Sequence, residues 1–351
     1  AWVGLFNWLP FFWLCLAIQP YLATPASRTR LGQWILAGTV PVIAVSLIQK
    51  ATGYEGLLES FWGLIRWPMG QPETGAALFD NANVTGSWLA VTLPFLAVAC
   101  LGPRQAMERR LTAVAITLGS TIALVITNSR NAMAAVPVIW ALSCGRRGRL
   151  AVLLVTLGYG ALVLLKLQHG APALDPVLDL LVPDRLIGKV LKTISERPES
   201  LRYANRSTIF AAALGHIASA PWFGLGENGF SLVYARDVIR MNGALPPTGG
   251  ILHSHNLWLE FAVSHGLPAL VLLMSLVGRS VKQALPLLWT RAEGSDRAWL
   301  LATLAMLWVH LWDIPSFDAR INVLDWLLVA GIACIACSRP VEAQPRPLAS
   351  T

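Results

Sequence analysis

Apolar stretches about as long as a membrane-spanning helix recur along most of the chain. A bilayer core of ~30 Å takes about 20 mostly apolar residues to cross as a helix. Lipid offers no partner to an unpaired peptide group, so we expect helices rather than open strands. Nine segments meet or approach this length: 2–23, 31–49, 84–101, 111–127, 132–144, 150–167, 257–277, 298–312 and 323–337. The pattern predicts an all-α, polytopic membrane helix bundle with about nine spans.

Two connections between these segments are long, and the second, from 168 to 255, is much the longer. No part of it is apolar enough to span a bilayer. Its composition favours a folded cap, since residues 184–197 have an amphipathic pattern typical of an interfacial helix. Residues 207–218 predict a second helix that ends before Pro221. The expected domains are helices 1–6 over 1–167, a cap loop over 168–255, helices 7–9 over 256–337, and a tail over 338–351.

Basic residues are concentrated in alternate connections. One set contains Arg28 and Arg30; Arg104, Arg109 and Arg110; Arg146, Arg147 and Arg149; Arg279, Lys282, Arg291 and Arg297; and Arg339 and Arg346. The short connections on the other side contain only Lys50, Arg66, Arg130 and Arg320. By the positive-inside rule the first set is cytoplasmic, which places the cap loop outside, in the periplasm of a bacterial inner membrane protein. The net charge of +8 is therefore a topology signal, and we expect no nucleic-acid partner.

Composition agrees with a membrane protein and excludes a disordered or disulfide-rich secreted chain. Charged residues make up 13% of the sequence, about half the share of a soluble domain. The five cysteines lie in or beside the apolar segments, so packing rather than disulfides should hold the cap. The chain begins inside an apolar run with no charged segment before it, which does not resemble a cleaved signal peptide. We expect that helices upstream are missing.

The segment from 252 to 268, LHSHNLWLEFAVSHGLP, places several polar residues at the mouth of the seventh span. His253 and His255 come first, Asn256 is positioned to cap a helix, and Glu260 lies about one turn inside. Gly266 and Pro268 should weaken the helix further along.

Three interpretations of the His-x-His pair compete. With His310 the pair would offer three zinc ligands; alternatively it is a structural pair at the interface. The third interpretation, which we favour, is a histidine that accepts a proton from a hydroxyl or orients it.

Three arginines on the expected outward side are candidates for binding an anion. Arg130 lies in a short turn, NSRN, against the trend of the positive-inside rule. It either extends to lipid headgroups or binds phosphate oxygens through paired hydrogen bonds. Arg202 and Arg206 lie at the expected start of a cap helix, where the helix dipole also favours an anion.

The glycines of PWFGLGENGF (residues 221–230) predict a flexible turn between the cap helix and the rest of the loop. Their G-x-G-x-x-G spacing is no dinucleotide fingerprint, because no strand precedes it. One outward face thus combines a histidine, arginines and a polar cap. This combination suits a lipid-anchored anionic ligand and a second, neutral polar substrate.

The pattern HSHNLWLEFAVSHGLP resembles the signature of the O-antigen ligase and O-antigen polymerase superfamily. Three further segments agree in order: NANVTGSWLAVTLP (81–94), TNSRNA (127–132) and the stretch 206–230, an Arg-x-x-x-aromatic helix followed by Pro-x-F-G-x-G. The resemblance covers roughly residues 80 to 280.

This resemblance implies a metal-independent, GT-C-like glycosyltransferase that needs no cofactor and works at the periplasmic face. Its donor would be a glycan on undecaprenyl pyrophosphate, and its acceptor a hydroxyl of lipid A core, another glycan or a protein. His255 would be the base or orienting group, supported by His253, Asn256 and Glu260, while Arg130 and Arg206 would hold the pyrophosphate. Many members have Trp where this chain has Phe210, which leaves Arg202 as an alternative to Arg206.

A transporter of inorganic carbon or another small anion is the competing function within the same superfamily. Such a site should lie near the midplane at broken helices, where the sequence offers only Glu260, His265 and Asp325. A purely structural membrane protein with an exposed cap is a third possibility. The clustering of polar residues at the outer surface favours transfer chemistry.

Overall fold

The computed structural model describes residues 2–60, 65–79, 81–101, 107–168, 205–244, 253–288 and 294–338, with isolated positions between 178 and 191. The helices are α1 (Trp2–Leu22), α2 (Pro25–Thr52), α3 (Ala82–Leu101), α4 (Met107–Thr127), α5 (Arg130–Ser143), α6 (Arg146–Leu167), α9 (Arg206–Ser219), α10 (Gly229–Asn242), α11 (Leu257–His265), α12 (Leu267–Ala284), α13 (Gly294–His310) and α14 (Ala319–Ser338). Short 3-10 turns include η6 (Pro315–Phe317).

Each of the nine apolar segments expected to span the membrane is helical, and the prediction of a polytopic helix bundle is confirmed. Within the described residues, six helices are long and apolar enough to cross a bilayer: α2, α3, α4, α6, α12 extended to Leu288, and α14. The helices α5 and α13 are shorter, with 14 and 17 residues. The full number of nine spans remains a prediction. The expected seventh span is broken at Gly266, between α11 and α12.

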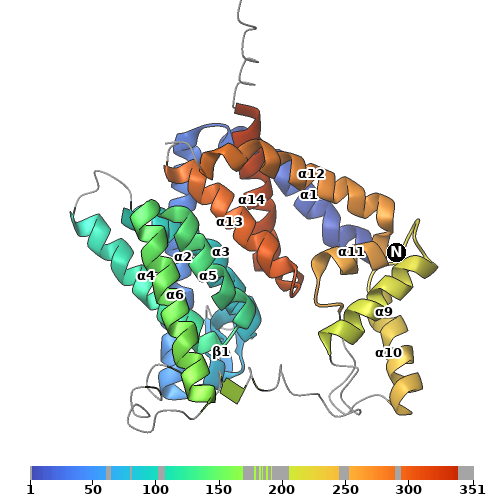
Figure 1. Ribbon diagram of the computed structural model, residues 1–351. Helices are drawn as coiled ribbons and strands as arrows, with labels where there is room; N and C mark the ends of the chain where they lie inside the picture. Colours follow the sequence, from blue (N-terminus) through green and yellow to red (C-terminus); the bar gives the residue numbers. More distant parts are fainter. Residues whose placement is uncertain are drawn as a thin grey trace, which may run out of the picture.

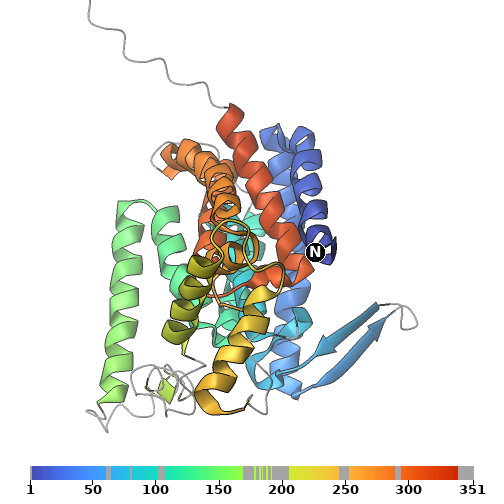
Figure 2. The same cartoon turned by 90° about the vertical axis from the view of Figure 1, so that its right-hand side faces the viewer.

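One element departs from the all-α expectation. The connection after α2 contains a hairpin of β1 (Gly56–Ser60) and β2 (Ile65–Met69), paired antiparallel with Gly56 opposite Met69. Figure 2 shows this hairpin projecting from the side of the bundle.

The core of the bundle surrounds α3, which packs against α13, α4, α5 and α2, while α14 packs against α1, α12 and α13 (Figure 1). Trp299 of α13 is fully buried, and a side chain at Gly331 of α14 would collide with its ring. The helix α6 lies at the edge, packs against α5 and has no buried residue.

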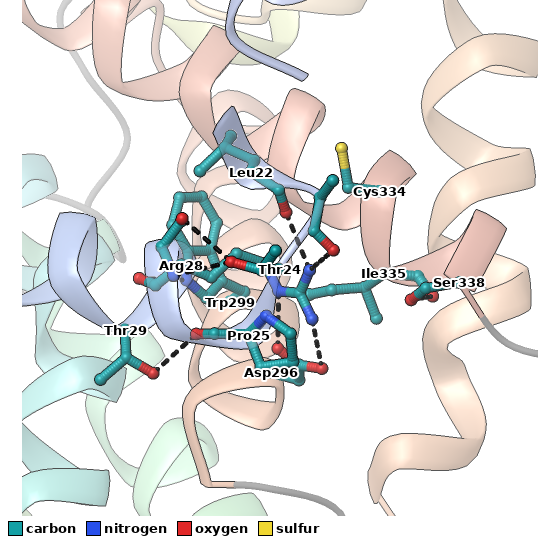
Figure 3. Close-up of polar contacts among 12 residues, drawn as sticks. Leu22, Thr24, Pro25, Arg28, Thr29, Asp296, Trp299, Cys334, Ile335 and Ser338 are labelled. Carbon is teal, nitrogen blue, oxygen red and sulfur yellow. Dashed lines mark hydrogen bonds and ion pairs between the residues drawn. The ribbon is translucent and has the colours of Figure 1, made fainter. Parts of the chain in front are cut away.

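A buried arginine fastens one end of the bundle. Arg28, 1% exposed, lies in the first turn of α2 and forms a two-pronged ion pair with Asp296 of α13, at 2.8 and 2.9 Å. Its Nη1 also donates to the carbonyls of Leu22 and Ala23, at the end of α1. Figure 3 shows this guanidinium between the α1–α2 turn and the end of α14, with Trp299 donating to the Arg28 carbonyl. A guanidinium can serve all these acceptors because its donors are fixed in a planar fork.

Several of the basic connections lie together, as their charge predicted. Besides the Arg28–Asp296 pair, Arg297 at the start of α13 donates to the carbonyl of Leu142 near the end of α5. The ends of α1, α5 and α14 and the start of α13 therefore share one end of the bundle, the upper end in Figure 1. The assignment of that end to the cytoplasm remains a prediction.

The cap helices α9 and α10 pack on α11 through a small core of their own. Its buried members are Ile209, Ala213, Ile217, Phe230, Tyr234, Val238, Ala262 and Val263. The predicted second cap helix is thus confirmed as α9. The expected interfacial helix over 184–197 lies for the most part outside the described residues.

The α9–α10 turn is held by backbone bonds, which corrects the expectation of a flexible turn. We call residues 220–226 and 262–267 together the glycine clamp. Three bonds join its two segments: Leu225 N–H to Val263 O at 2.7 Å, Gly226 N–H to Ser264 O at 3.0 Å, and Leu267 N–H to Pro221 O at 2.7 Å.

Two glycines allow the segments of the clamp to approach this closely. Gly224 has φ +68°, and a Cβ there would lie 2.5 Å from the backbone of Ser264. Gly266 has φ +85°, and a Cβ there would lie 2.3 Å from the carbonyl oxygen of Trp222. Both positions therefore require glycine, for space as well as for backbone conformation.

Candidate functional site

His255 lies in the connection before α11 and points at a carboxylate from another part of the chain. Its Nδ1 is 3.1 Å from Oδ1 of Asp313, and the two side chains are 29% and 14% exposed. An ionised carboxylate accepts only, so the shared proton sits on Nδ1, and in the neutral imidazole Nε2 then has the lone pair. His255 also has φ +54°, an uncommon conformation for a residue with a side chain. This geometry suits a general base.

Asp313 was missed by the sequence analysis, which considered His310 as the partner of the histidine pair. It follows α13, its N–H donates to the carbonyl of Val309, and its Oδ1 accepts from the N–H of Ile314. Burial raises the pKa of Asp313, but the hydrogen bond and charge of His255 outweigh burial and lower it overall. The only sequence signal was an acidic residue in a short outward connection.

His253 holds the backbone of the loop and does not share the role of His255 as a base. Its Nδ1 accepts the backbone N–H of His255 at 3.1 Å, and its ring meets that of Phe317 edge-on at 5.5 Å. Burial lowers the pKa of His253 to about 4, and the charges of His255 and Arg206 add to this effect. His253 is therefore neutral at pH 7.

The structure corrects the proposed set of metal ligands. Ligand atoms of His253, His255 and Asp313 lie within 4.8 Å of one another, a set that could hold zinc with one open position. His310 is elsewhere, where its Nε2 lies 2.8 Å from Oδ2 of Asp325 in α14. This second pair is buried and borders a cavity of about 40 Å³.

Asn256 and Glu260 hold the histidine loop in place. Oδ1 of Asn256 accepts from the N–H of Leu259 and so caps α11 as expected, while its Nδ2 donates to the carbonyl of Leu311. The carboxylate of Glu260 accepts the N–H of Ser254 at 2.7 Å. Both residues thus fix the backbone on either side of His255.

Arg206 is the first residue of α9 and lies near the histidine pair. Its positive charge is close enough to contribute to the lowered pKa of His253. The clamp and the cap core position α9 against α11, and thereby position Arg206. Arg202 lies outside the described residues.

Arg130 is the first residue of α5, and its turn is tied to the segment that contains Asp313. The neighbouring Asn131 donates to the carbonyl of Val309 and accepts from Nε1 of Trp308. The same Val309 carbonyl accepts the N–H of Asp313. Gly86 of α3 makes room for this turn, since a Cβ there would lie 2.7 Å from Cβ of Ser129.

The structure joins an imidazole oriented by a carboxylate to Arg206 at the start of α9, whose charge acts on His253. Arg130, at the start of α5, is linked to the same region through the bonds of Asn131 to the end of α13. Helix N-termini and guanidinium groups both stabilise anions. The imidazole can remove a proton from a hydroxyl, so the site offers base catalysis beside anion-binding groups.

One comparison relates part of the chain to a known family. Residues 113–274 match the family model described as O-antigen ligase. The match runs from α4 into α12 and includes Arg130, Arg206, His253 and His255, whereas Asp313 lies beyond it. The curated proteins contain no match to this chain.

Proposed function

We propose that this chain, whose residues 113–274 match the O-antigen ligase family model, transfers a glycan from undecaprenyl pyrophosphate to an acceptor hydroxyl. The family is one of membrane glycosyltransferases of ligase or polymerase type. The proposed reaction takes place at the periplasmic end of the helices, in an inner membrane, with a glycan, lipid A core or protein as acceptor.

In the proposed step, Nε2 of His255 takes the proton of the acceptor hydroxyl. The oxygen attacks the anomeric carbon, a new glycosidic bond forms, and the bond from that carbon to the pyrophosphate oxygen breaks. The bonding electrons leave with the pyrophosphate, whose growing negative charge Arg130 and Arg206 stabilise. Asp313 stabilises the imidazolium that results.

The observation that carries this proposal is the bond between His255 and Asp313, with Arg206 close enough for its charge to act on His253. The half-buried carboxylate of Asp313 holds the ring of His255 in one orientation through Nδ1. The orientation leaves Nε2, the atom that the chemistry requires, available to a substrate.

The test is reconstitution of the full chain in lipid vesicles with a glycan linked to undecaprenyl pyrophosphate, measuring release of the lipid carrier. H255A should abolish transfer, and D313N should reduce it by about a hundredfold or more, because the amide favours the wrong tautomer. H216Q is the matched control, since His216 pairs with Asp237 in the cap. Full activity of H255A would remove the base assignment.

Metal independence is part of the proposal and is tested separately. Chelators should leave transfer unchanged, since the chemistry above uses only side chains. Inhibition by a chelator, reversed by zinc, would instead make His253, His255 and Asp313 metal ligands.

Transport of inorganic carbon or another small anion is the second candidate. The break between α11 and α12 and the buried His310–Asp325 pair favour it, because transporter sites lie at broken helices within the bilayer. Uptake of labelled bicarbonate by the same vesicles, without release of the lipid carrier, would support transport over transfer.

A further inference from the structure

A cavity of about 460 Å³ lies beside the histidine pair and takes no part in the chemistry described above. It is lined by Trp8, Pro10, Phe11, Glu227, Asn228, Ser316, Phe317, Ala319 and Asn322. The volume lies within the range of small-ligand sites, about 300–1,000 Å³. Three separate parts of the chain form its wall: the first half of α1, the turn before α10, and η6 with the start of α14. Figure 1 shows the N-terminal end of α1 near the cap helices.

The cavity is connected to the proposed reaction centre through Phe317. This residue lines the cavity and also meets the ring of His253 edge-on, with ring centroids 5.5 Å apart. His253 in turn holds the backbone of His255. A ligand in the cavity would therefore lie one aromatic side chain away from the histidine pair.

The lining combines two kinds of group that together recognise a carbohydrate. Trp8, Phe11 and Phe317 offer aromatic rings, which can pack on the C–H faces of a sugar. Asn228 and Asn322 each offer a carbonyl and an amino group for hydroxyls. Neither amide forms a side-chain hydrogen bond to any other residue in the part of the chain described by the structure.

The charge of the cavity excludes the pyrophosphate end of the donor. Glu227 contributes a carboxylate, held 3.4 Å from His265, and no lysine or arginine is among the described lining residues. The described arginines proposed for pyrophosphate, Arg130 and Arg206, start other helices. The cavity is thus suited to a neutral, hydroxyl-rich ligand.

We propose that this cavity is the subsite for a neutral sugar residue of the acceptor. The inference rests on the proposed function and makes it more specific, because it selects a glycan over a protein as the acceptor. The sugar packs against the rings of Trp8 and Phe317 and bonds to Asn228 and Asn322, while the glycan continues past Phe317 so that a neighbouring sugar brings the acceptor hydroxyl to His255.

The first experiment measures binding alone and does not depend on transfer. Saturation-transfer NMR on the full chain in detergent uses methyl glycosides of neutral hexoses, with glucose 1-phosphate as an anionic comparison. We expect the neutral glycosides to bind and the phosphate not to bind. N322A and N228G should each weaken binding about tenfold, the value of a lost hydrogen bond or two. Glycine at 228 keeps the left-handed backbone, φ +58°, of Asn228.

The matched control is V323A, next to Asn322 in the sequence and 39% exposed, which should bind like the unaltered chain. An unchanged thermal unfolding midpoint shows that each variant is folded. Binding that survives in both asparagine variants, or preference for the phosphate, would overturn the sugar subsite.

The second experiment measures steady-state transfer. N322A and N228G should raise KM for the acceptor glycan about tenfold, with KM for the lipid-linked donor unchanged. A rise in the donor KM instead would overturn the assignment to the acceptor. Failure of the proposed function has a different outcome: sugar binding that depends on both asparagines, but no carrier release even from the unaltered chain.

Discussion

Replacing Gly266 with alanine should open the glycine clamp and loosen the cap. The residue joins α11 to α12 with φ +85° and ψ 168°, a region that only glycine adopts readily. The added Cβ would lie 2.3 Å from the carbonyl oxygen and 2.5 Å from the carbonyl carbon of Trp222. Neither atom can turn away, because both belong to the backbone.

The magnitude follows from two contributions. Forcing alanine into this backbone conformation costs about 1–3 kcal/mol. Relieving the collision separates the two segments of the clamp and breaks one or two of its three hydrogen bonds, each worth about 1 kcal/mol. A total of about 3 kcal/mol shifts the opening equilibrium of the clamp by about a hundredfold.

Amide hydrogen exchange, read by mass spectrometry on a peptide spanning residues 221–228, measures this opening directly. The amides of Leu225 and Gly226 are bonded across the clamp and should exchange about a hundredfold faster in G266A. Carrier release should fall as well, because α9 carries Arg206. G215A is the control, since Gly215 lies in α9 with open space around its Cβ position. Equal exchange in G266A and G215A would refute the reasoning.

Three further predictions concern other parts of the chain. R28A should lower the free energy of unfolding by about 3–5 kcal/mol, because it leaves Asp296 without its partner, whereas R30A at an exposed neighbouring position should change it little; equal effects would contradict the anchoring role. R130K should transfer glycan at a small fraction of the normal rate, since an ammonium cannot form the forked contact with phosphate; normal transfer by R130K would remove the phosphate role. The pKa of His253 is lowered to about 4 from an ordinary value near 6.5, so its contribution to stability is full above pH 6.5 and is lost as the pH falls through 4. Unfolding midpoints from pH 7 to 4 should therefore decline less in H253N, which keeps an acceptor for the His255 N–H; parallel declines would argue against a buried neutral His253.

The fold could be predicted from the sequence because lipid imposes a strong pattern. An uninterrupted apolar run has few alternatives to a helix, so each expected span became helical. The β1–β2 hairpin left a weaker trace, since it lies in a long connection between apolar segments, where lipid imposes no such constraint. The sequence indicated a weakened helix at Gly266 and Pro268, but a single span was expected there, and the structure shows a break.

The candidate site was only partly predictable. His255 and Arg130 stood out because polar residues are conspicuous in apolar surroundings. Asp313 did not, since its role depends on the end of α13 lying beside a loop 58 residues earlier in the chain. The expectation of a flexible turn at Gly224 was wrong. A glycine allows a flexible backbone, but it also allows two backbone segments to pack closely, and only the structure shows which of these applies.

The anchor at Arg28 also sets the register of distant parts of the molecule. Its guanidinium fixes the end of α1, at Leu22, against α13. At 1.5 Å per residue, Trp8 lies roughly 21 Å further along the same helix. Slippage of α1 by one residue would therefore shift Trp8 by about 1.5 Å relative to Asn322. The polar anchor at one end of α1 thus sets the position of an aromatic side chain in the wall of a distant cavity.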